Sequence, residues 1–479
     1  MPHLENVEVP ALPPQRFQEV IPSDRYERFA RVIGEAKALL DNRVVWNVNS
    51  TAKGGGVAEM LHSLLAYAKG AGVDARWVVI RGDTDFFRIT KRIHNHLHGS
   101  AGDGGELAEA ERTAYEHTLV ANAEALSEVV APGDVVLLHD PQTAGLTPML
   151  KEQGVTVIWR CHVGLDLPND LARGAWRFLI PYITGADAYV FSREAFQWEG
   201  LQQERTHVIP PSIDAFAAKN QDMKPETVHS ILAATALTDG EAPGRPFFAE
   251  VDGSEGIVTR RTELCGSPPL PEGARVVVQV SRWDRLKDPL GVMQGFAEHV
   301  APRSDAHLVL AGPSVEAVAD DPEGAEVLTE TRSAWERLPA ASRSRVHLAC
   351  LPMEDGAENA AIVNALQRRA SVVVQKSLAE GFGLTVAEAM WKGRPVVASR
   401  IGGIQDQIED GITGSLVDDP RNLAEYGAAV TRLLEDEALA ERIGQNAQER
   451  VRDEFLGPRH LIQYVDLIRK LISEEGPLP

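Results

Sequence analysis

A glycine-rich turn flanked by two glutamates has the residue types that recognise a sugar nucleotide. In chain order these residues are Glu380, Gly381, Phe382, Gly383, Leu384, Thr385 and Glu388. An apolar run ends just before them, so we expect a buried strand, a turn and then a helix. The N–H groups at a helix N-terminus attract a phosphate, and the two carboxylates can accept hydrogen bonds from sugar hydroxyls.

The same pattern also has a purely structural interpretation. Thr385 and Glu388 fit a capping box, in which both side chains bond main-chain N–H groups at the start of a helix. Gly393 and Pro395 would then end that helix, and the glycines before it would be turn residues only. The motif alone leaves both interpretations open.

Two basic residues follow an earlier apolar run and could bind a diphosphate. Arg282 and Lys287 stand five positions apart after the predicted strand 276–280. The planar fork of arginine and the point charge of lysine suit two phosphates, and they would stabilise the charge that builds up when a diphosphate leaves a sugar. The opposing interpretation is that both residues pair with Asp284 and Asp288 on a solvated turn.

Polar residues also follow strands in the first half of the chain. They are Gly54, Gly55, Gly56 and Glu59 after the first strand, and Asp140 and His162 after two later strands. The carboxyl ends of parallel strands lie at one edge of a sheet, so we expect Asp140 and His162 to share a rim. The glycine loop is neither G-x-G-x-x-G nor a Walker loop, and it predicts either a close approach to a ligand or a plain tight turn.

Strands alternate with helices through both halves of the chain, which is typical of an α/β fold with parallel sheets. A length of 479 residues exceeds what one core supports, so we expect two Rossmann-like domains. The first would comprise residues 1–212, with the C-terminal helix 459–479 packed back on it. The second would comprise residues 213–458, with a linker-like insertion at 215–273.

Composition restricts the partners and the location of the protein. A net charge of −21 argues against non-specific binding to nucleic acid or to anionic membranes. No apolar run reaches the roughly 18 residues that span a bilayer, and the start of the chain lacks the apolar region of a signal peptide. We therefore expect a cytoplasmic protein, with a homodimer as the default assembly.

The residue types that bind metals or form disulfides occur without the required spacing. The three cysteines are far apart in sequence, which argues against a disulfide framework or a structural zinc site. Asp83-x-Asp85 is a short pattern of common residues, and we interpret it as a solvated loop rather than a metal site. The sequence therefore predicts no metal ligands.

Taken together, the motifs resemble those of GT-B glycosyltransferases of the retaining, family 4 type. The resemblance covers nearly the whole chain and includes the connector 211–214, the basic pair, the two glutamates and Gly402-Gly403-Ile404. Within the family, WNVNSTAKGGGVAEM, LLHDPQ, WRCH and EGFGLTVAEAMWKG are most similar to the trehalose glycosyltransferring synthases. Those enzymes couple a nucleoside-diphosphate glucose to free glucose.

The resemblance implies a GT-B fold, in which two Rossmann-like domains face each other across a cleft, and it implies a role for each motif. In the second domain, Arg282 and Lys287 would hold the donor diphosphate, Glu380 and the turn after it the donor glucose, and Glu388 the ribose. In the first domain, His162 would lie over the donor sugar, while Asp140, Glu59 and the glycine loop would face the acceptor glucose. The reaction would require no cofactor, because the leaving diphosphate would itself take the acceptor proton. The donor could be ADP-glucose, UDP-glucose or GDP-glucose.

The sequence departs from the family pattern at two places, and it is compatible with further functions. The segment 215–273 is longer than the family connector, and Gln405-Asp406-Gln407 stands where a Pro-Glu pair is common. A trehalose phosphorylase that uses glucose 1-phosphate would have a similar fold. A family 4 transferase with a different small polar acceptor and a non-catalytic sensor of sugar nucleotides would also fit these motifs. An NAD dehydrogenase is disfavoured, because no G-x-G-x-x-G with a downstream acidic residue is present.

Overall fold

The computed structural model describes residues 4–52, 55–314 and 322–475. The chain forms two compact units, each with its own sheet. Unit 1 comprises Met1–Ser212 together with Phe455–Pro479, and unit 2 comprises Ile213–Glu454. The first crossing between the units follows Ser212, and the chain returns to unit 1 at Phe455, a few residues before the predicted start of the last helix.

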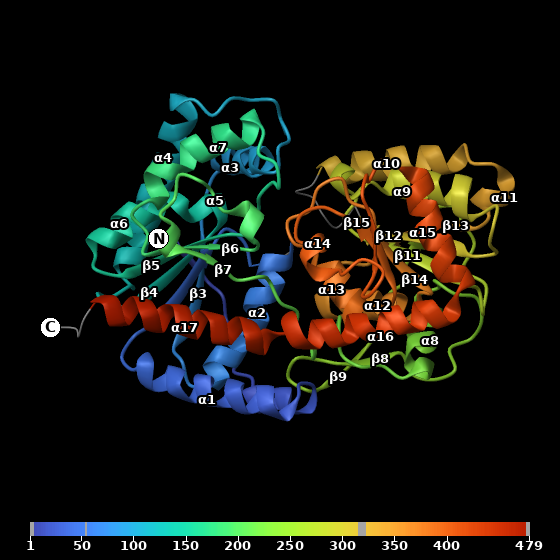
Figure 1. Cartoon of the computed structure of the whole chain (residues 1–479), viewed down its shortest axis with the longest axis horizontal. Coiled ribbons are helices and arrows are strands. Elements are labelled where there is room, and N and C mark those ends of the chain that lie inside the picture. Colours follow the sequence, from blue (N-terminus) through green and yellow to red (C-terminus); the bar gives the residue numbers. More distant parts are fainter. Residues whose placement is uncertain (1–3, 53–54, 315–321, 476–479) are drawn as a thin grey trace. The chain divides into compact units, whose positions relative to one another are not determined.

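Unit 1 is built on a seven-stranded sheet (Figure 1). Its strands, in spatial order, are β1 (Leu4–Asn6), β3 (Ala75–Ile80), β2 (Val45–Asn49), β4 (Val135–His139), β5 (Thr156–Cys161), β6 (Ala188–Phe191) and β7 (Thr206–Val208). Only β1 runs antiparallel to its neighbour; the other pairs are parallel. The central strands are buried along their whole length, as expected for a parallel sheet with helices on both faces.

Helices cover both faces of the unit 1 sheet. The helices are α1 (Ser23–Leu39), α2 (Gly55–Gly70), α3 (Thr84–Leu97), α4 (Glu109–Ser127), α5 (Asp140–Thr143), α6 (Thr147–Glu152), α7 (Asp170–Ile183) and α17 (Gly457–Glu475). Side chains of α3, α4 and α7 form the larger apolar core on one face. On the other face α17, coloured red in Figure 1, packs against α1 and α2.

Unit 2 repeats the plan with a second seven-stranded sheet. Its strands, in spatial order, are β10 (Glu263–Leu264), β13 (Val346–Leu351), β12 (His307–Pro313), β11 (Val276–Val280), β14 (Val372–Gln375), β15 (Val396–Ser399) and β16 (Ser415–Val417). Its helices are α8 (Pro225–Ala234), α9 (Pro289–Gly295), α10 (Pro322–Glu336), α11 (Ala340–Arg343), α12 (Gly356–Arg369), α13 (Leu384–Trp391), α14 (Ile404–Gln407), α15 (Leu423–Glu435) and α16 (Glu437–Glu454). Two mostly parallel sheets, each with one antiparallel edge strand and with helices between the strands, confirm the predicted fold class. Within the described part of the chain, no helix has the length and apolar character that crossing a membrane requires.

The prediction of a linker-like insertion at 215–273 is wrong. Helix α8 packs against α12, and β10 pairs with β13 at the edge of the main sheet. A short hairpin of β8 (Phe247–Ala249) and β9 (Glu255–Ile257) lies between them in sequence. The segment contributes fully buried side chains such as Ile231 and Leu232. Its high glycine, proline and charge content suggested a linker, but a few apolar residues at the right spacing suffice to bind it to unit 2.

In each sheet the strand order reverses direction at one point, and ligands of doubly wound folds bind at such points. In unit 1 this point lies between β2 and β4, which lead into the glycine loop and into Asp140. In unit 2 it lies between β11 and β14, which lead into Lys287 and Glu380. The topology therefore gathers the predicted residues at the carboxyl edge of each sheet.

Helix α13, which carries Glu388, is held by a close backbone contact. A Cβ at Gly444 of α16 would lie 2.2 Å from the carbonyl oxygen of Gly393, just after α13. We therefore expect Gly444→Ala to lower the free energy of unfolding by about 1–3 kcal/mol, because overpacking against backbone forces the helices apart. Gly356→Ala, where nothing lies within 4 Å of the added carbon, serves as the control and should change stability by less than about 1 kcal/mol. Urea denaturation measures both, and equal stability of the two variants would contradict the contact.

Candidate functional site

The core of the site in unit 2 is an ion pair between two residues predicted from the sequence. Lys287 Nζ lies 2.6 Å from Glu380 Oε2, and the two side chains are 18% and 12% exposed. They come from the loops after β11 and β14, which are neighbours in the sheet. Ser377 Oγ also donates to Glu380 Oε2, over 3.4 Å. A cation and a carboxylate thus meet at a mostly buried point that remains open to solvent.

The loop that carries Lys287 is held by hydrogen bonds to its main chain. Gln279 donates from Nε2 to the main-chain oxygen of Lys287 over 2.9 Å, and Leu378 N donates to Leu286 O over 2.7 Å. Asp288 follows in the left-handed conformation (φ 49°) and caps α9 through Gly291 N. Its carboxylate also pairs with Lys376, a fully buried lysine that donates to Pro420 O as well. Lys287 is therefore held on a rigid turn.

Arg282 occupies a more open position than Lys287. Its guanidinium donates to Asp284 over 3.0 Å, and 54% of its side chain is exposed. The structural interpretation of the basic pair thus holds in part: Arg282 does contact Asp284, whereas Lys287 pairs with Glu380 and Asp288 pairs with Lys376. A role for Arg282 in binding a diphosphate stays a prediction.

The glycine turn after Glu380 is supported by the loop that follows β15. Gly403 N donates to Gly381 O over 2.9 Å, and Gln407 Nε2 donates to Phe382 O over 2.5 Å. A Cβ on Gly402 would lie 1.9 Å from the carbonyl oxygen of Glu380. The two loops are thus in backbone contact, and only glycine fits at that point.

The predicted capping box at Thr385 and Glu388 is wrong. Helix α13 begins at Leu384, its N-cap is Gly383 in the left-handed conformation (φ 84°), and no side chain caps it. Thr385 Oγ1 instead donates to Gln375 Oε1 over 3.2 Å. The positive φ of Gly383 starts the helix one residue before the threonine, which removes Thr385 from the cap position.

Glu388 lies buried on α13, beside two lysines. Its Oε1 is 3.8 Å from Lys219 Nζ, and only 3% of its side chain is exposed. Lys392 donates to the main-chain oxygen of Glu388 over 3.0 Å and to Asn220 Oδ1 over 3.1 Å. Burial lowers the pKa of Lys392 to about 7, although the charge of Glu388 opposes the shift. Glu388 does not cap α13, so its position beside two lysines is consistent with the predicted role in binding the ribose.

In unit 1, Asp140 and His162 are brought together as the strand order predicts. Asp140 Oδ1 accepts a hydrogen bond of 2.7 Å from His162 N. Asp140 has φ 63°, a left-handed conformation that aspartate tolerates better than most residues. Burial raises the pKa of its carboxyl to about 7, while the His162 N–H and the charge of Arg160 act in the opposite direction.

A buried hydrogen-bond network lies beneath this pair. His139 Nε2 is 3.0 Å from Asn47 Oδ1, and His139 Nδ1 is 3.2 Å from His162 Nε2. With Asn47 Oδ1 as the acceptor, His139 carries its proton on Nε2, and its Nδ1 accepts from His162. Arg160, fully buried, directs its Nε–H at the His162 ring, 3.1 Å from Nε2 and 3.3 Å from Nδ1, and also donates to Tyr464.

This network keeps both histidines neutral. Burial lowers the pKa of His139 to about 3 and that of His162 well below its ordinary value, and the nearby charge of Arg160 adds to both shifts. Both ring nitrogens of His162 have partners within unit 1. A contact of the His162 imidazole with a sugar therefore requires the ring to exchange a partner.

Three further residues predicted for unit 1, Gly55, Gly56 and Glu59, lie at the start of α2. Gly55 has φ 80°, and no atom of the described residues lies within 4 Å of a Cβ built there. Gly56 is half-buried and Glu59 is exposed on the first turns of the helix. Gly54 lies outside the described residues. Their contact with an acceptor sugar stays a prediction.

The pKa of Asp140 leads to a testable pH dependence. If the ionised carboxylate accepts a hydroxyl of the acceptor, kcat/KM for the acceptor should rise as the pH increases through about 7. Asp140→Asn should remove that ionisation and leave a flatter, lower profile, because asparagine also tolerates the left-handed backbone. Initial rates between pH 5.5 and 8.5 measure the effect. An unchanged ionisation near pH 7 in Asp140→Asn would assign it to another group.

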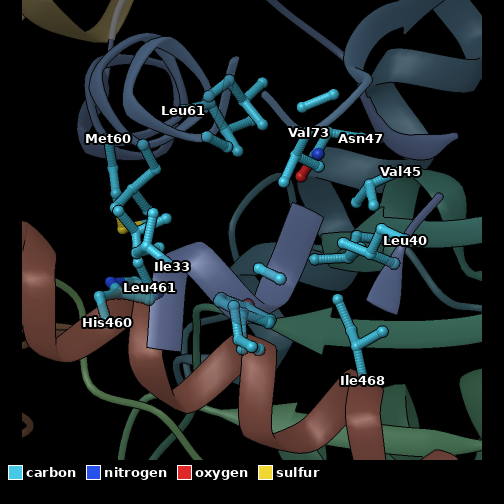
Figure 2. Close-up of a pocket in the computed structure, with 18 of the residues that line it drawn as sticks. Ile33, Leu40, Val45, Asn47, Met60, Leu61, Val73, His460, Leu461 and Ile468 are labelled. Carbon is cyan, nitrogen blue, oxygen red and sulfur yellow. The ribbon is translucent and has the colours of Figure 1, made fainter. Parts of the chain in front are cut away.

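A cavity of about 80 Å³ lies within unit 1, enclosed by α1, α2, α17 and the sheet (Figure 2). Asn47 and His139 form part of its wall, so it reaches the network from the side of α17. Most of the other lining side chains are aliphatic, including Leu40, Leu61 and Ile468. A sugar needs many hydroxyl partners, so we locate the candidate site at the carboxyl edge of the strands rather than in this cavity.

Several supporting residues were not identified from the sequence. They are Lys376, Ser377 and Gln407 in unit 2, and Asn47, His139 and Arg160 in unit 1. A signal existed for Arg160, because a single arginine in the strand TVIWRC must be satisfied when buried. Gln407 had no such signal, since its bonds run to main-chain atoms of a loop distant in sequence.

Comparison with known proteins agrees with this architecture. Residues 47–198 match the family described as "Trehalose synthase, N-terminal domain", and residues 261–450 match "Glycosyl transferases group 1". A trehalose synthase from Rubrobacter xylanophilus is 34% identical over 95% of this chain and 96% of its own length. A trehalose phosphorylase from Pleurotus sajor-caju is 27% identical over 80% of this chain and 52% of its own length.

The fold also matches solved structures. A UDP-forming α,α-trehalose-phosphate synthase from Burkholderia xenovorans superposes with a TM-score of 0.66. The superposition covers 90% of this chain and 99% of the synthase, with 16% sequence identity. At so low an identity the match supports a shared GT-B fold and nothing more specific. The predicted GT-B fold and the predicted similarity to trehalose synthases are both confirmed. The chain belongs to the trehalose synthase family of GT-B glycosyltransferases.

Proposed function

We propose that the protein transfers glucose with retention from a nucleoside-diphosphate glucose to free glucose and forms trehalose. The observation that carries this proposal is the Lys287–Glu380 pair at the point of strand-order reversal in unit 2. Family membership supports glycosyl transfer in trehalose metabolism, and the pair supports a glucose donor that carries phosphate. Unit 2 would bind the donor, and unit 1 would bind the acceptor.

The ion pair suits a ligand that has a negatively charged group for Lys287 and hydroxyl groups for Glu380. In the protein alone, Lys287 and Glu380 neutralise each other, so neither charge is left isolated at a mostly buried position. A diphosphate would compete for Lys287 Nζ, and Glu380 would then be able to accept hydroxyls of the attached glucose. The turn 381–383 would add main-chain N–H groups, and the buried carboxylate of Glu388 would hold the ribose.

The charges of these residues support the proposed reaction. As the bond from the glucose anomeric carbon to the diphosphate breaks, Lys287 and Arg282 stabilise the negative charge on the leaving group. The acceptor hydroxyl attacks from the same face and gives its proton to the departing diphosphate. This route retains configuration without the second carboxylate, about 5 Å from the first, that retaining glycosidases use. The proton balance closes without a cofactor.

In unit 1, Asp140 is the proposed hydrogen-bond acceptor for the second glucose. Its carboxyl is held by the His162 N–H, and its main chain is held by Trp159 Nε1, which donates to Asp140 O over 3.2 Å. A rigid carboxylate can orient one hydroxyl for attack. Glu59 and the start of α2 would contribute further contacts.

A phosphorylase that uses glucose 1-phosphate is the second candidate. Its support is the similarity to the Pleurotus enzyme and the chemistry of Lys287, because a lysine that binds a diphosphate can also bind a single phosphate. A third candidate is a transferase with another small polar acceptor.

Product analysis with a panel of donors and acceptors distinguishes these functions. The purified protein is incubated with ADP-glucose, UDP-glucose, GDP-glucose or glucose 1-phosphate, each with glucose or another small polyol, and products are separated by chromatography. We expect trehalose from at least one sugar nucleotide and glucose. Activity with glucose 1-phosphate alone would assign the phosphorylase. Binding of a donor without any product would favour a sensor.

A further inference from the structure

Unit 2 contains two of the three cysteines of the chain in direct contact. Cys265 and Cys350 have their sulfur atoms 3.6 Å apart, although they are 85 residues apart in sequence. The third, Cys161, lies in unit 1, where its thiol donates to Val163 O. The sulfur atoms of the pair need to approach by about 1.5 Å to reach the covalent S–S length of about 2.05 Å.

The position of the pair allows that movement. Cys265 directly follows β10, a two-residue strand at the edge of the sheet, and its N–H donates to Leu348 O over 3.0 Å. Gly266 comes next with φ 83°. A terminal residue of a short edge strand can shift or open at low cost, whereas Cys350 is fixed within β13. Both cysteines are buried, so a reagent reaches them only when β10 opens locally.

We infer that Cys265 and Cys350 are a modification site: they form a reversible disulfide by exchange with a low-molecular-weight disulfide. The thiolate of Cys265, after loss of its proton to solvent, attacks one sulfur of the reagent and expels a thiolate, which takes up a proton. Cys350 then loses its proton and attacks the Cys265 sulfur, expelling the second thiolate. One reagent disulfide is reduced to two thiols and one protein disulfide forms, so two electrons are transferred.

The electrostatics favour this order of attack. The contact with Cys350 lowers the pKa of the Cys265 thiol, while the same contact and burial raise the pKa of Cys350. Cys265 is thus the better first nucleophile, and it follows the two-residue edge strand rather than lying within β13. The product would fasten the edge strand β10 to β13, and with it the segment 215–273, to the core of unit 2.

Thiol counting on the full-length protein tests the inference. The protein is incubated with oxidised glutathione a few degrees below its unfolding midpoint, so that edge strands open, and thiols are counted after denaturation. We expect the count to fall from three to one, the mass to drop by two hydrogen atoms, and a peptide map to link Cys265 with Cys350. Dithiothreitol should restore all three thiols.

The matched variant is Cys350→Ala, which removes the resolving thiol and leaves Cys265 in place. It should yield a mixed disulfide of glutathione on Cys265 and no disulfide within the chain. Retention of three thiols by the wild type at equilibrium would overturn the inference, as would a disulfide that involves Cys161. Neither outcome bears on the proposed glucosyl transfer, which does not use these residues.

Discussion

Lys287→Ala is expected to lower kcat by about 10²-fold or more, with the fold retained. The lysine is the mostly buried cation at the strand-order reversal of unit 2, and its removal takes away the charge that stabilises the leaving diphosphate. Lys287 would also hold the bound donor, so KM for the donor should rise as well, but the charge that builds up on the leaving group makes the effect on kcat the larger one. Arg282→Ala should act in the same direction and also by roughly 10²-fold, although its side chain is more exposed.

Arg285→Ala is the matched control for these variants. Arg285 lies on the same short turn as Lys287 but pairs with Glu330 on α10, away from Glu380. Its removal should leave kcat within about twofold, because an exposed ion pair contributes little. Steady-state kinetics with the preferred donor measure all three variants. Turnover near the wild-type rate in both Lys287→Ala and Arg282→Ala would contradict the assignment of the donor site.

Gly402→Ala is expected to lower kcat about as much as the loss of a catalytic side chain would, although glycine has no side chain that could contribute to catalysis. A Cβ there would lie 1.9 Å from the carbonyl oxygen of Glu380 and would enter a left-handed backbone position (φ 47°). The turn that carries Glu380 must move, and a displacement of about 1 Å in a positioning group can lower turnover by about 10²-fold. The folded fraction should remain high, since the strain is confined to two loops.

Gly411→Ala separates displacement of Glu380 from backbone strain. Gly411 also has a positive φ, 75°, but nothing lies within 4 Å of the added carbon. Both variants thus carry similar strain, and only Gly402→Ala contacts the donor turn. Kinetics and thermal denaturation of the pair provide the comparison. Equal activity of the two variants would show that turnover does not depend on the position of the turn 380–383.

The sequence predicted the strands and the edge at which polar residues gather, because both depend on local patterns. Apolar runs such as VVVQV and VVLLH ended at the residues that the structure places at the carboxyl edge. Polar residues directly after a strand, such as Asp140 and His162, therefore had predictable positions. The parallel arrangement of the strands followed from the α/β alternation.

Features that depend on contacts distant in sequence were not predictable. The pairing of Lys287 with Glu380, rather than with a nearby aspartate, is set by β11 and β14 lying side by side. The start of α13 at Leu384 depends on the left-handed Gly383, which local patterns did not distinguish from a capping box at Thr385. The same holds for Cys265 and Cys350, whose separation in sequence gave no sign of their contact.

The most direct test of the central proposal follows the anomeric carbon of the donor through the reaction. Nucleoside-diphosphate glucose labelled with ¹³C at that carbon is mixed with unlabelled glucose and the protein, and the products are observed by NMR. We predict trehalose with one labelled anomeric carbon in the α configuration, formed together with free nucleoside diphosphate. Labelled disaccharide with inverted configuration, or no labelled disaccharide with any of the three donors, would contradict the account.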